Sequence, residues 1–151
     1  MKFIIEKKEA FKIMGLLGCE DKNTVREGDM TGVWAEFMAN YDKKLRDYYS
    51  PPYGQIGAKS VELENGKSRV IVGAEYKEKM VKGMSIEEIP AATWAAFSYE
   101  YPAGFSLYEE NYKRIVTEWL PTSGYKRDEN VMHLELYDDE KWQLRIPIIS
   151  K

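Results

Sequence analysis

The order of structural patterns along the chain restricts the fold more than any single motif does. Two segments, residues 31–49 and 106–119, have helical periodicity, and each follows an extended apolar stretch and precedes a β-hairpin pattern. The order strand region, helix, hairpin therefore occurs twice, which indicates an internal repeat of about 1–80 and 84–149. Two such β-α-β-β units predict an α+β fold, in which one antiparallel sheet carries both helices on one face. A ligand groove is expected where the two pseudo-symmetric halves meet.

The helical segments are recognised by an apolar stripe opposite charged side chains. Thr31 is the expected N-cap of the first helix, and the Ser-Pro-Pro sequence from Ser50 is expected to end it. In the second helix, Ser106 and Glu109 have capping-box spacing, and Pro121 and Gly124 mark the exit. The stripes consist of Val33, Trp34, Phe37, Met38, Tyr41, Leu45 and Tyr48 in the first helix, and of Tyr108, Tyr112, Ile115 and Trp119 in the second.

Two hairpins complete the pattern. Residues 61–76 place Asn65-Gly66 between two β-rich runs, a strong hairpin signal. Residues 131–148 read as two strands joined by an acidic Asp-Asp-Glu-Lys turn, which favours a solvated turn over a metal site. In the first of these strands Met132, Leu134 and Leu136 share one face, and Val131, His133, Glu135 and Tyr137 share the other.

Length and charge exclude several classes of protein. A chain of 151 residues is expected to form one domain, 1–151, and its net charge of −3 is evenly interspersed, which argues against a nucleic-acid partner. A single cysteine and a single histidine make a zinc site improbable, and no cofactor is indicated. No signal sequence or apolar run of membrane-spanning length is present, so a cytoplasmic protein with no membrane partner is expected.

Glu135 is the unusual residue of the last hairpin, because it lies between the only histidine and a tyrosine on one strand face. Alternation alone favours an ordinary carboxylate on the wet face of an antiparallel sheet. The alternative is a carboxylate placed in an apolar pocket to receive a cation.

An ordered set of short blocks resembles the GyrI-like small-molecule-binding domains, which also occur as effector-binding domains of bacterial transcription activators. The resemblance covers essentially the whole chain. The blocks are EKKEAFKIMGL, GVWAEFM, YGQIGAKSVE, VIVGAEY, IEEIPAATWAAF, YKRIVTEWLPTSGY, HLELYD and WQLRIPI.

The resemblance implies that the glutamate of the ELYD block, Glu135, lies in a ligand pocket between the two units. Members that bind lipophilic cations use this glutamate for charge and aromatic residues for walls. Because the chain lacks the helix-turn-helix segment of the activators, it resembles a stand-alone member without direct DNA binding.

Several aromatic residues are candidates for the walls. His133 and Tyr137 accompany Glu135 by alternation, although a partly exposed His133 with one hydrogen bond is favoured over a residue that tunes the charge of Glu135. On the strand around residues 93–101, Phe97, Tyr99 and Tyr101 share one face and Trp94 the other, so one set is expected to border the groove. Trp142 is expected at its rim. The aromatic residues of the helical stripes are expected in the core. Tyr53 and Tyr76 are weaker candidates.

Three functions from different classes follow. The first is a binder of small lipophilic molecules, cationic or planar aromatic, which sequesters them or senses them for a regulatory protein partner. The second, on the resemblance, is a hydrolase of electrophilic small molecules with Glu135 as general base and Tyr99 or Tyr137 as hydrogen-bond donor. The third is an inhibitor of DNA gyrase that acts through an acidic surface including Asp138, Asp139 and Glu140.

Overall fold

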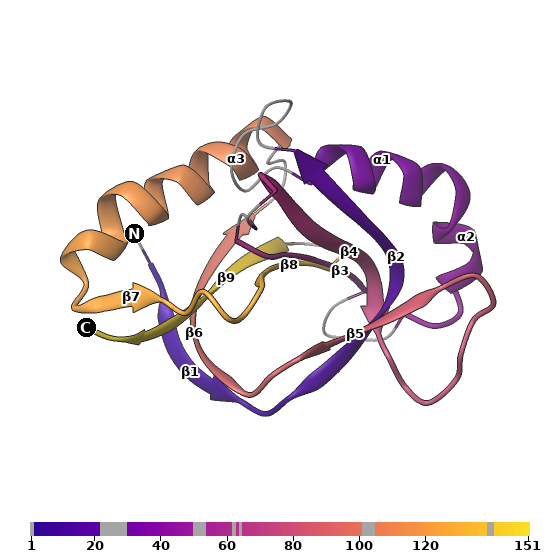
Figure 1. Ribbon diagram of the computed structural model, residues 1–151, viewed down its shortest axis with the longest axis horizontal. Helices are drawn as coiled ribbons and strands as arrows, with labels where there is room; N and C mark the ends of the chain where they lie inside the picture. The colour runs from indigo at the N-terminus through magenta and orange to yellow at the C-terminus, as the bar shows by residue number, and fades with distance from the viewer. Residues whose placement is uncertain are drawn as a thin grey trace.

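The chain folds into one strongly curved antiparallel sheet with helices on its convex face (Figure 1). The computed structural model describes residues 2–21, 30–49, 54–61, 63, 65–100, 105–138 and 141–151, and only the backbone of 20, 21, 31 and 105–109. The strands are β1 (Ile4–Lys8), β2 (Phe11–Asp21), β3 (Gln55–Lys59), β4 (Lys67–Glu75), β5 (Ser85–Ile89), β6 (Ala92–Glu100), β7 (Tyr125–Arg127), β8 (His133–Tyr137) and β9 (Lys141–Ser150). The helices are α1 (Thr31–Asn40), α2 (Asp42–Leu45) and α3 (Phe105–Arg114), which continues as a π-helical turn, Ile115–Trp119, and a 3-10 turn, Leu120–Thr122.

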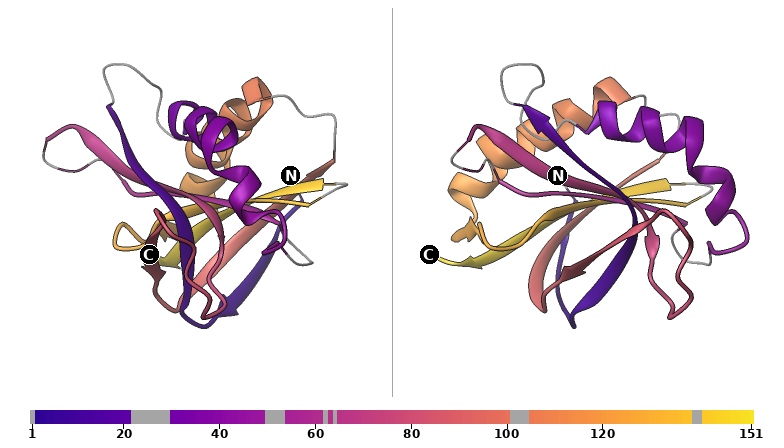
Figure 2. Two further views of the ribbon diagram at one scale, coloured as in Figure 1. Left: turned by 90° about the vertical axis from the view of Figure 1, so that its right-hand side faces the viewer. Right: turned by 45° about the vertical axis from the view of Figure 1, so that its right-hand side comes forward.

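The strand order is β1-β6-β9-β8-β3-β4-β2-β5, with β7 added beside β9. The order is symmetric about its centre: each of β1, β2, β3 and β4 in one half has the position that β5, β6, β8 and β9, respectively, have in the other half. The middle of the sheet is therefore the β3–β8 pair, and β1 and β5 each pair with a strand of the opposite half. The prediction of one antiparallel sheet with both helices on one face is confirmed (Figure 2).

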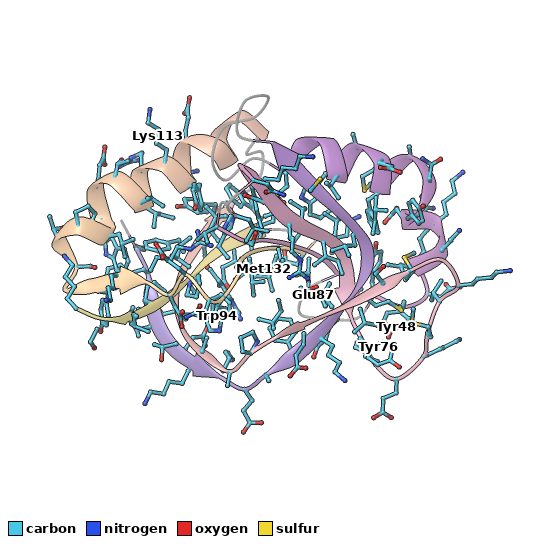
Figure 3. All side chains as sticks on the ribbon, viewed as in Figure 1. Tyr48, Tyr76, Glu87, Trp94, Lys113 and Met132 are labelled. Atoms are coloured by element: carbon cyan, nitrogen blue, oxygen red, sulfur yellow. The ribbon has the colours of Figure 1, made fainter. Side chains whose placement is uncertain are left out.

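Alternation along the strands builds a separate core on each face of the sheet. The convex core, under the helices, contains Trp34, Phe37, Tyr112, Phe97 and Trp142. The concave core fills the space that the curved sheet encloses, where Trp94 and Met132 are seen in Figure 3. Strands buried on both faces explain why these sequences contain few polar residues at alternate positions.

The first helical segment is interrupted, whereas the sequence predicts one helix over residues 31–49. Tyr41 leaves the helical conformation at φ −122°, between α1 and α2. The next residue, Asp42, is buried and accepts hydrogen bonds from the Tyr49 hydroxyl (2.7 Å) and the Gln55 side-chain amide (2.9 Å). These bonds tie the helix end to the start of β3, which periodicity does not reveal.

Other local predictions need correction. Thr31 is the first helical residue and Met30 the N-cap, because the Met30 side chain is buried in the convex core. Met38, predicted on the buried stripe, is 48% exposed. The hairpin at Asn65-Gly66 forms, with Gly66 at φ 77° and the Leu63 N–H donating to the Lys67 carbonyl, and the strand that pairs with β4 is β3. Strand β7 was not predicted.

Some predictions concern residues or side chains outside the part of the chain that the structure describes. They concern Ser50, Tyr53, Tyr101, Asp139, Glu140 and the side chains of Ser106, Tyr108 and Glu109. Among the described helices, none combines the length and the apolar character that crossing a bilayer requires.

Candidate functional site

Glu135 lies at the centre of the sheet, on the face covered by the helices. It belongs to β8 and pairs in register with Gly57 of β3 on one side and Leu144 of β9 on the other. Its side chain is only 1% exposed. The interpretation of Glu135 as an ordinary carboxylate on a wet sheet face is therefore wrong, and a titratable group occupies the middle of the molecule.

Glu135 is hydrogen-bonded to Trp34 and lies against the backbone of Gly57. The indole Nε1 of Trp34, on α1, donates a hydrogen bond to Glu135 Oε1. A Cβ atom on Gly57 would lie 2.9 Å from Glu135 Oε1 and 3.0 Å from Trp34 Cζ2. Glycine at position 57 therefore leaves the space that the Glu135 carboxylate and the Trp34 indole occupy.

A continuous line of aromatic rings runs from Trp34 across the sheet. The ring centroids of Trp34 and Tyr137 are 5.3 Å apart, those of Tyr137 and Trp142 are 6.2 Å apart, and those of Trp142 and Tyr99 are 4.5 Å apart. We call these four residues the aromatic row. Tyr137 and Tyr99 alternate in this row with the two tryptophans, and both carry hydroxyl groups and are half-buried. Burial raises the pKa of the Tyr99 hydroxyl to about 12, so it is a neutral donor.

The remaining predicted residues divide between the two faces of the sheet. Phe97 is on the helix-covered face, but it packs on Trp119 at 5.1 Å and on Phe3 at 5.6 Å, beside the row. Trp94 belongs to the concave core, so it does not share a site with Glu135. Trp142 is 2% exposed and pairs with Tyr137, so it lies within the row and not at a rim. Tyr76 packs at the edge of the convex core.

His133 is buried rather than partly exposed, which corrects the favoured prediction. Its ring lies 4.6 Å from that of Tyr112, and Arg127 Nη1 approaches its Nδ1 at 3.4 Å. Arg127 Nη1 also donates to the Tyr112 hydroxyl at 2.8 Å. Desolvation, followed by the charges of Arg127 and Lys59, lowers the pKa of His133 well below its ordinary value, so the ring is neutral near pH 7.

The chemistry available here is the recognition of charge by a desolvated carboxylate. A buried carboxylate is stable only when it is hydrogen-bonded or paired with a cation. Aromatic faces attract cations, with about 0.5–2 kcal/mol per ring, and accept many ligand shapes. Within the described ranges, no group of three or more His, Cys, Asp or Glu side chains could hold a metal ion.

Comparison with known proteins identifies related folds and one family. Residues 4–148 match the model of Cass2, described as an integron-associated effector binding protein. No curated protein sequence matches the chain significantly.

Three solved structures share the fold at low sequence identity. The structure of SAV2435 bound to tetraphenylphosphonium superposes with a TM-score of 0.80 at 9% identity, over 99% of this chain and 94% of that one. An integron cassette protein from the mobile metagenome of Vibrio cholerae gives 0.70 at 15% identity, over 97% and 95%. The C-terminal domain of EcmrR gives 0.67 at 10% identity, over 99% and 98%.

Proposed function

The chain belongs to the Cass2 family of integron-associated effector binding proteins and has a GyrI-like effector-binding fold, and on this premise we propose the class of its ligand. Small lipophilic molecules, cationic or planar aromatic, bind at Glu135 and the aromatic row. The observation that carries the proposal is the burial of Glu135, at 1% exposure, on the same face as four stacked or edge-on rings. The protein sequesters such molecules or senses them for a protein partner.

The contact between Trp34 and Glu135 gives the proposal a mechanism. The indole N–H of Trp34 supplies a hydrogen bond to the carboxylate. An organic cation supplies a full opposite charge instead, which is a stronger interaction at a desolvated carboxylate than a neutral donor makes. Binding therefore exchanges the indole for the cation, and the rings of the row cover its apolar surface. The relative bound to tetraphenylphosphonium supports this ligand class.

The test is calorimetric titration with tetraphenylphosphonium and with triphenylphosphine oxide, a neutral compound of similar shape. The wild type is expected to bind the cation, and Glu135→Gln to bind it at least about tenfold more weakly, because the mutation removes the charge and keeps the shape. Glu118→Gln, on an exposed helix surface, serves as the matched control and should bind as the wild type does. Equal affinity of wild type and Glu135→Gln would refute the site.

Trp34→Phe provides a second, opposite readout. The phenyl ring keeps an aromatic surface beside the carboxylate but has no N–H to compete with the ligand. We expect tighter binding of tetraphenylphosphonium than in the wild type, whereas a residue that only supports the fold would weaken it. Weaker binding in a folded Trp34→Phe protein would argue against the exchange.

The alternative function, a hydrolase, uses the same residues. Product analysis distinguishes it from a binding protein. Tyr99 is a neutral donor, which a hydrolase would need at an accepting oxygen. Incubation with epoxides and activated esters, followed by mass spectrometry, would reveal turnover; loss of product in Glu135→Gln would favour the enzyme. Stoichiometric binding without product favours the binding protein. The gyrase-inhibitor hypothesis stays a prediction, to be tested by a supercoiling assay.

A further inference from the structure

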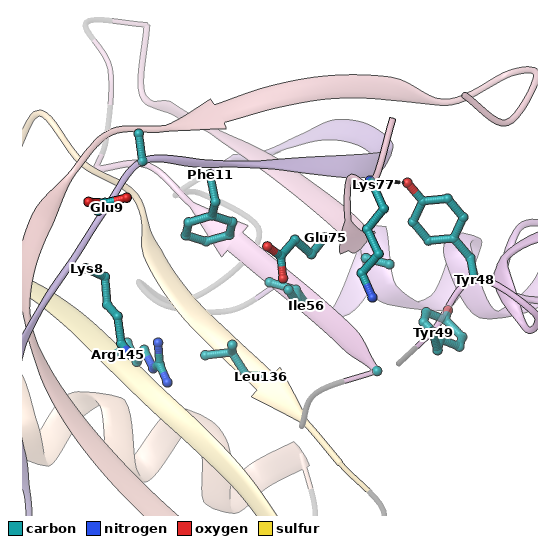
Figure 4. A pocket seen from close by; sticks show the side chains of 13 residues that line it. Lys8, Glu9, Phe11, Tyr48, Tyr49, Ile56, Glu75, Lys77, Leu136 and Arg145 are labelled. Carbon is teal, nitrogen blue, oxygen red and sulfur yellow. Dashed lines mark hydrogen bonds between the residues drawn. The ribbon is translucent and has the colours of Figure 1, made fainter. Parts of the chain in front are cut away.

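A second recessed site lies on the concave face of the sheet, and Tyr48 and Tyr49, which follow α2, close one end of it. It is a cavity of about 390 Å³ at one mouth of the space that the curved sheet encloses (Figure 4). We call it the mouth cavity. Ile56 of β3 and Leu136 of β8 line it, whereas their neighbours Gly57 and Glu135 meet Trp34 on the opposite face. The mouth cavity is therefore separated from the Glu135 site by the sheet itself.

The floor of the mouth cavity is apolar. Ile56 and Leu136 pair directly across the β3–β8 ladder, and each is almost fully buried, at 3% and 4% exposure. Phe11, half-buried at the start of β2, faces them across the cavity in Figure 4. The cavity volume is in the range of about 300–1,000 Å³ that is usual for small-molecule sites, and its floor offers a surface for a hydrocarbon or aromatic group.

A half-buried guanidinium lies at one end of this floor. The Arg145 side chain is only 13% exposed, and its Nε donates to Gln143 Oε1 at 2.6 Å, which fixes the plane of the group. Lys8 lies beside it, as Figure 4 shows. Glu6 approaches both cations, at 3.7 Å from Arg145 and 3.4 Å from Lys8, so the end carries two positive charges and one negative charge.

Three other charged residues belong to the lining. Glu75 lies beside Phe11 and Ile56, Lys77 lies toward Tyr48, and Glu9 is an exposed residue of the β1–β2 turn. Together with Glu6, three carboxylates and three cationic side chains surround the cavity, so its preference for an anion rests on the orientation of the Arg145 guanidinium. An oriented guanidinium next to an apolar surface is suited to a planar carboxylate, because its N–H groups can donate two parallel hydrogen bonds.

We propose that the mouth cavity binds small amphipathic carboxylates, with the carboxylate on Arg145 and the apolar body on Phe11, Ile56 and Leu136. The ligand class has the opposite charge to the one proposed for Glu135. This site goes beyond the proposed function, because it uses another face of the sheet and a separate set of side chains.

The test is calorimetric titration with 4-phenylbutyrate at neutral pH, together with 4-phenylbutanamide and 4-phenylbutylamine. The acid is expected to bind, with the amide and the amine at least about tenfold weaker, because loss of a charge-assisted hydrogen bond to the guanidinium costs a factor of this order. Arg145→Gln should weaken binding of the acid by about the same factor. Arg69→Gln, an arginine on β4 that pairs with Glu87, is the matched control and should leave binding unchanged.

Two further variants keep the proposal testable if Arg145→Gln does not fold. Glu75→Gln removes an exposed carboxylate from the lining and should tighten binding of the acid, whereas Lys8→Met should weaken it. Glu135→Gln should leave the acid unaffected, so failure of cation binding at Glu135 and failure of this site are distinguishable. The absence of heat with the acid, preference for the amine, or unchanged binding in Arg145→Gln and Lys8→Met would each overturn the proposal.

Discussion

The hydrogen bond between Trp34 and Glu135 makes a quantitative prediction about stability. Trp34→Phe removes the only donor of the indole and leaves the buried Oε1 without this bond. Hydrogen bonds to charged groups contribute about 1.5–3 kcal/mol, and truncation of the indole ring adds a smaller packing term. We therefore expect Trp34→Phe to lower the free energy of unfolding by about 2–4 kcal/mol.

A second substitution separates the hydrogen bond from the packing term. Glu135→Met replaces the carboxylate by an apolar side chain of similar length. In the double variant, Trp34→Phe with Glu135→Met, both the N–H donor and the carboxylate are absent, so no buried polar group is left without its hydrogen-bond partner. The double variant should be less destabilised than the sum of the single variants by about 1.5–3 kcal/mol.

Urea denaturation at pH 7 measures these free energies, provided that the m-values of the four proteins agree. A second cycle that combines Trp119→Phe with Glu135→Met is the control, because Trp119 packs on Phe97 and Phe3 instead. That cycle should be additive. If the Trp34 cycle is also additive within about 0.5 kcal/mol, the indole does not stabilise the carboxylate and the reasoning is refuted.

Further predictions concern three other positions. Gly57→Ala should destabilise the protein by about 1–3 kcal/mol and weaken tetraphenylphosphonium binding, since the new methyl group would meet Glu135 and Trp34; unchanged melting and binding would contradict this. Gly73→Ala should prevent folding or cost more than about 3 kcal/mol, because its Cβ would lie 1.9 Å from the Met14 carbonyl oxygen; circular dichroism and urea titration measure this. The pKa of His133 is lowered in the folded protein, so below about pH 6.5 the unfolded chain takes up a proton that the folded chain does not. Wild-type stability should fall there by up to about 1.4 kcal/mol per pH unit, and His133→Gln should lack this component when stability is measured from pH 7.5 to 5.0.

The sequence predicted the fold because its strongest signals are local. Asn65-Gly66 places a turn before β4, and the alternation around Leu134 and Leu136 marks β8 as a strand with one apolar face. The end of α1 was not predictable in this way. It depends on buried Asp42 and its bonds to Tyr49 and Gln55, and partners that are distant in sequence leave no mark on helical periodicity.

The candidate site was predicted in part. Alternation predicted that Glu135 shares a face with Tyr137. It did not predict that Glu135 is buried, because the burial comes from α1 crossing the sheet. Trp34 was expected only as a core residue, because a stripe aromatic gives no sign that its N–H faces a carboxylate. Gly57 could have pointed to this contact only if the register between β3 and β8 had been known.

The pairing of β1 with β6 has a consequence for synthesis on the ribosome. Residues 4–8 leave the ribosome before residues 92–96, which are their partners in the sheet. Until β6 has been made, the apolar residues Ile4 and Ile5 have no strand to pair with, although β2, β3 and β4 are already complete. The N-terminal half therefore cannot complete its strand pairing before β6 has left the ribosome, and a chain released before β6 would leave β1 open to pairing with chaperones and other chains.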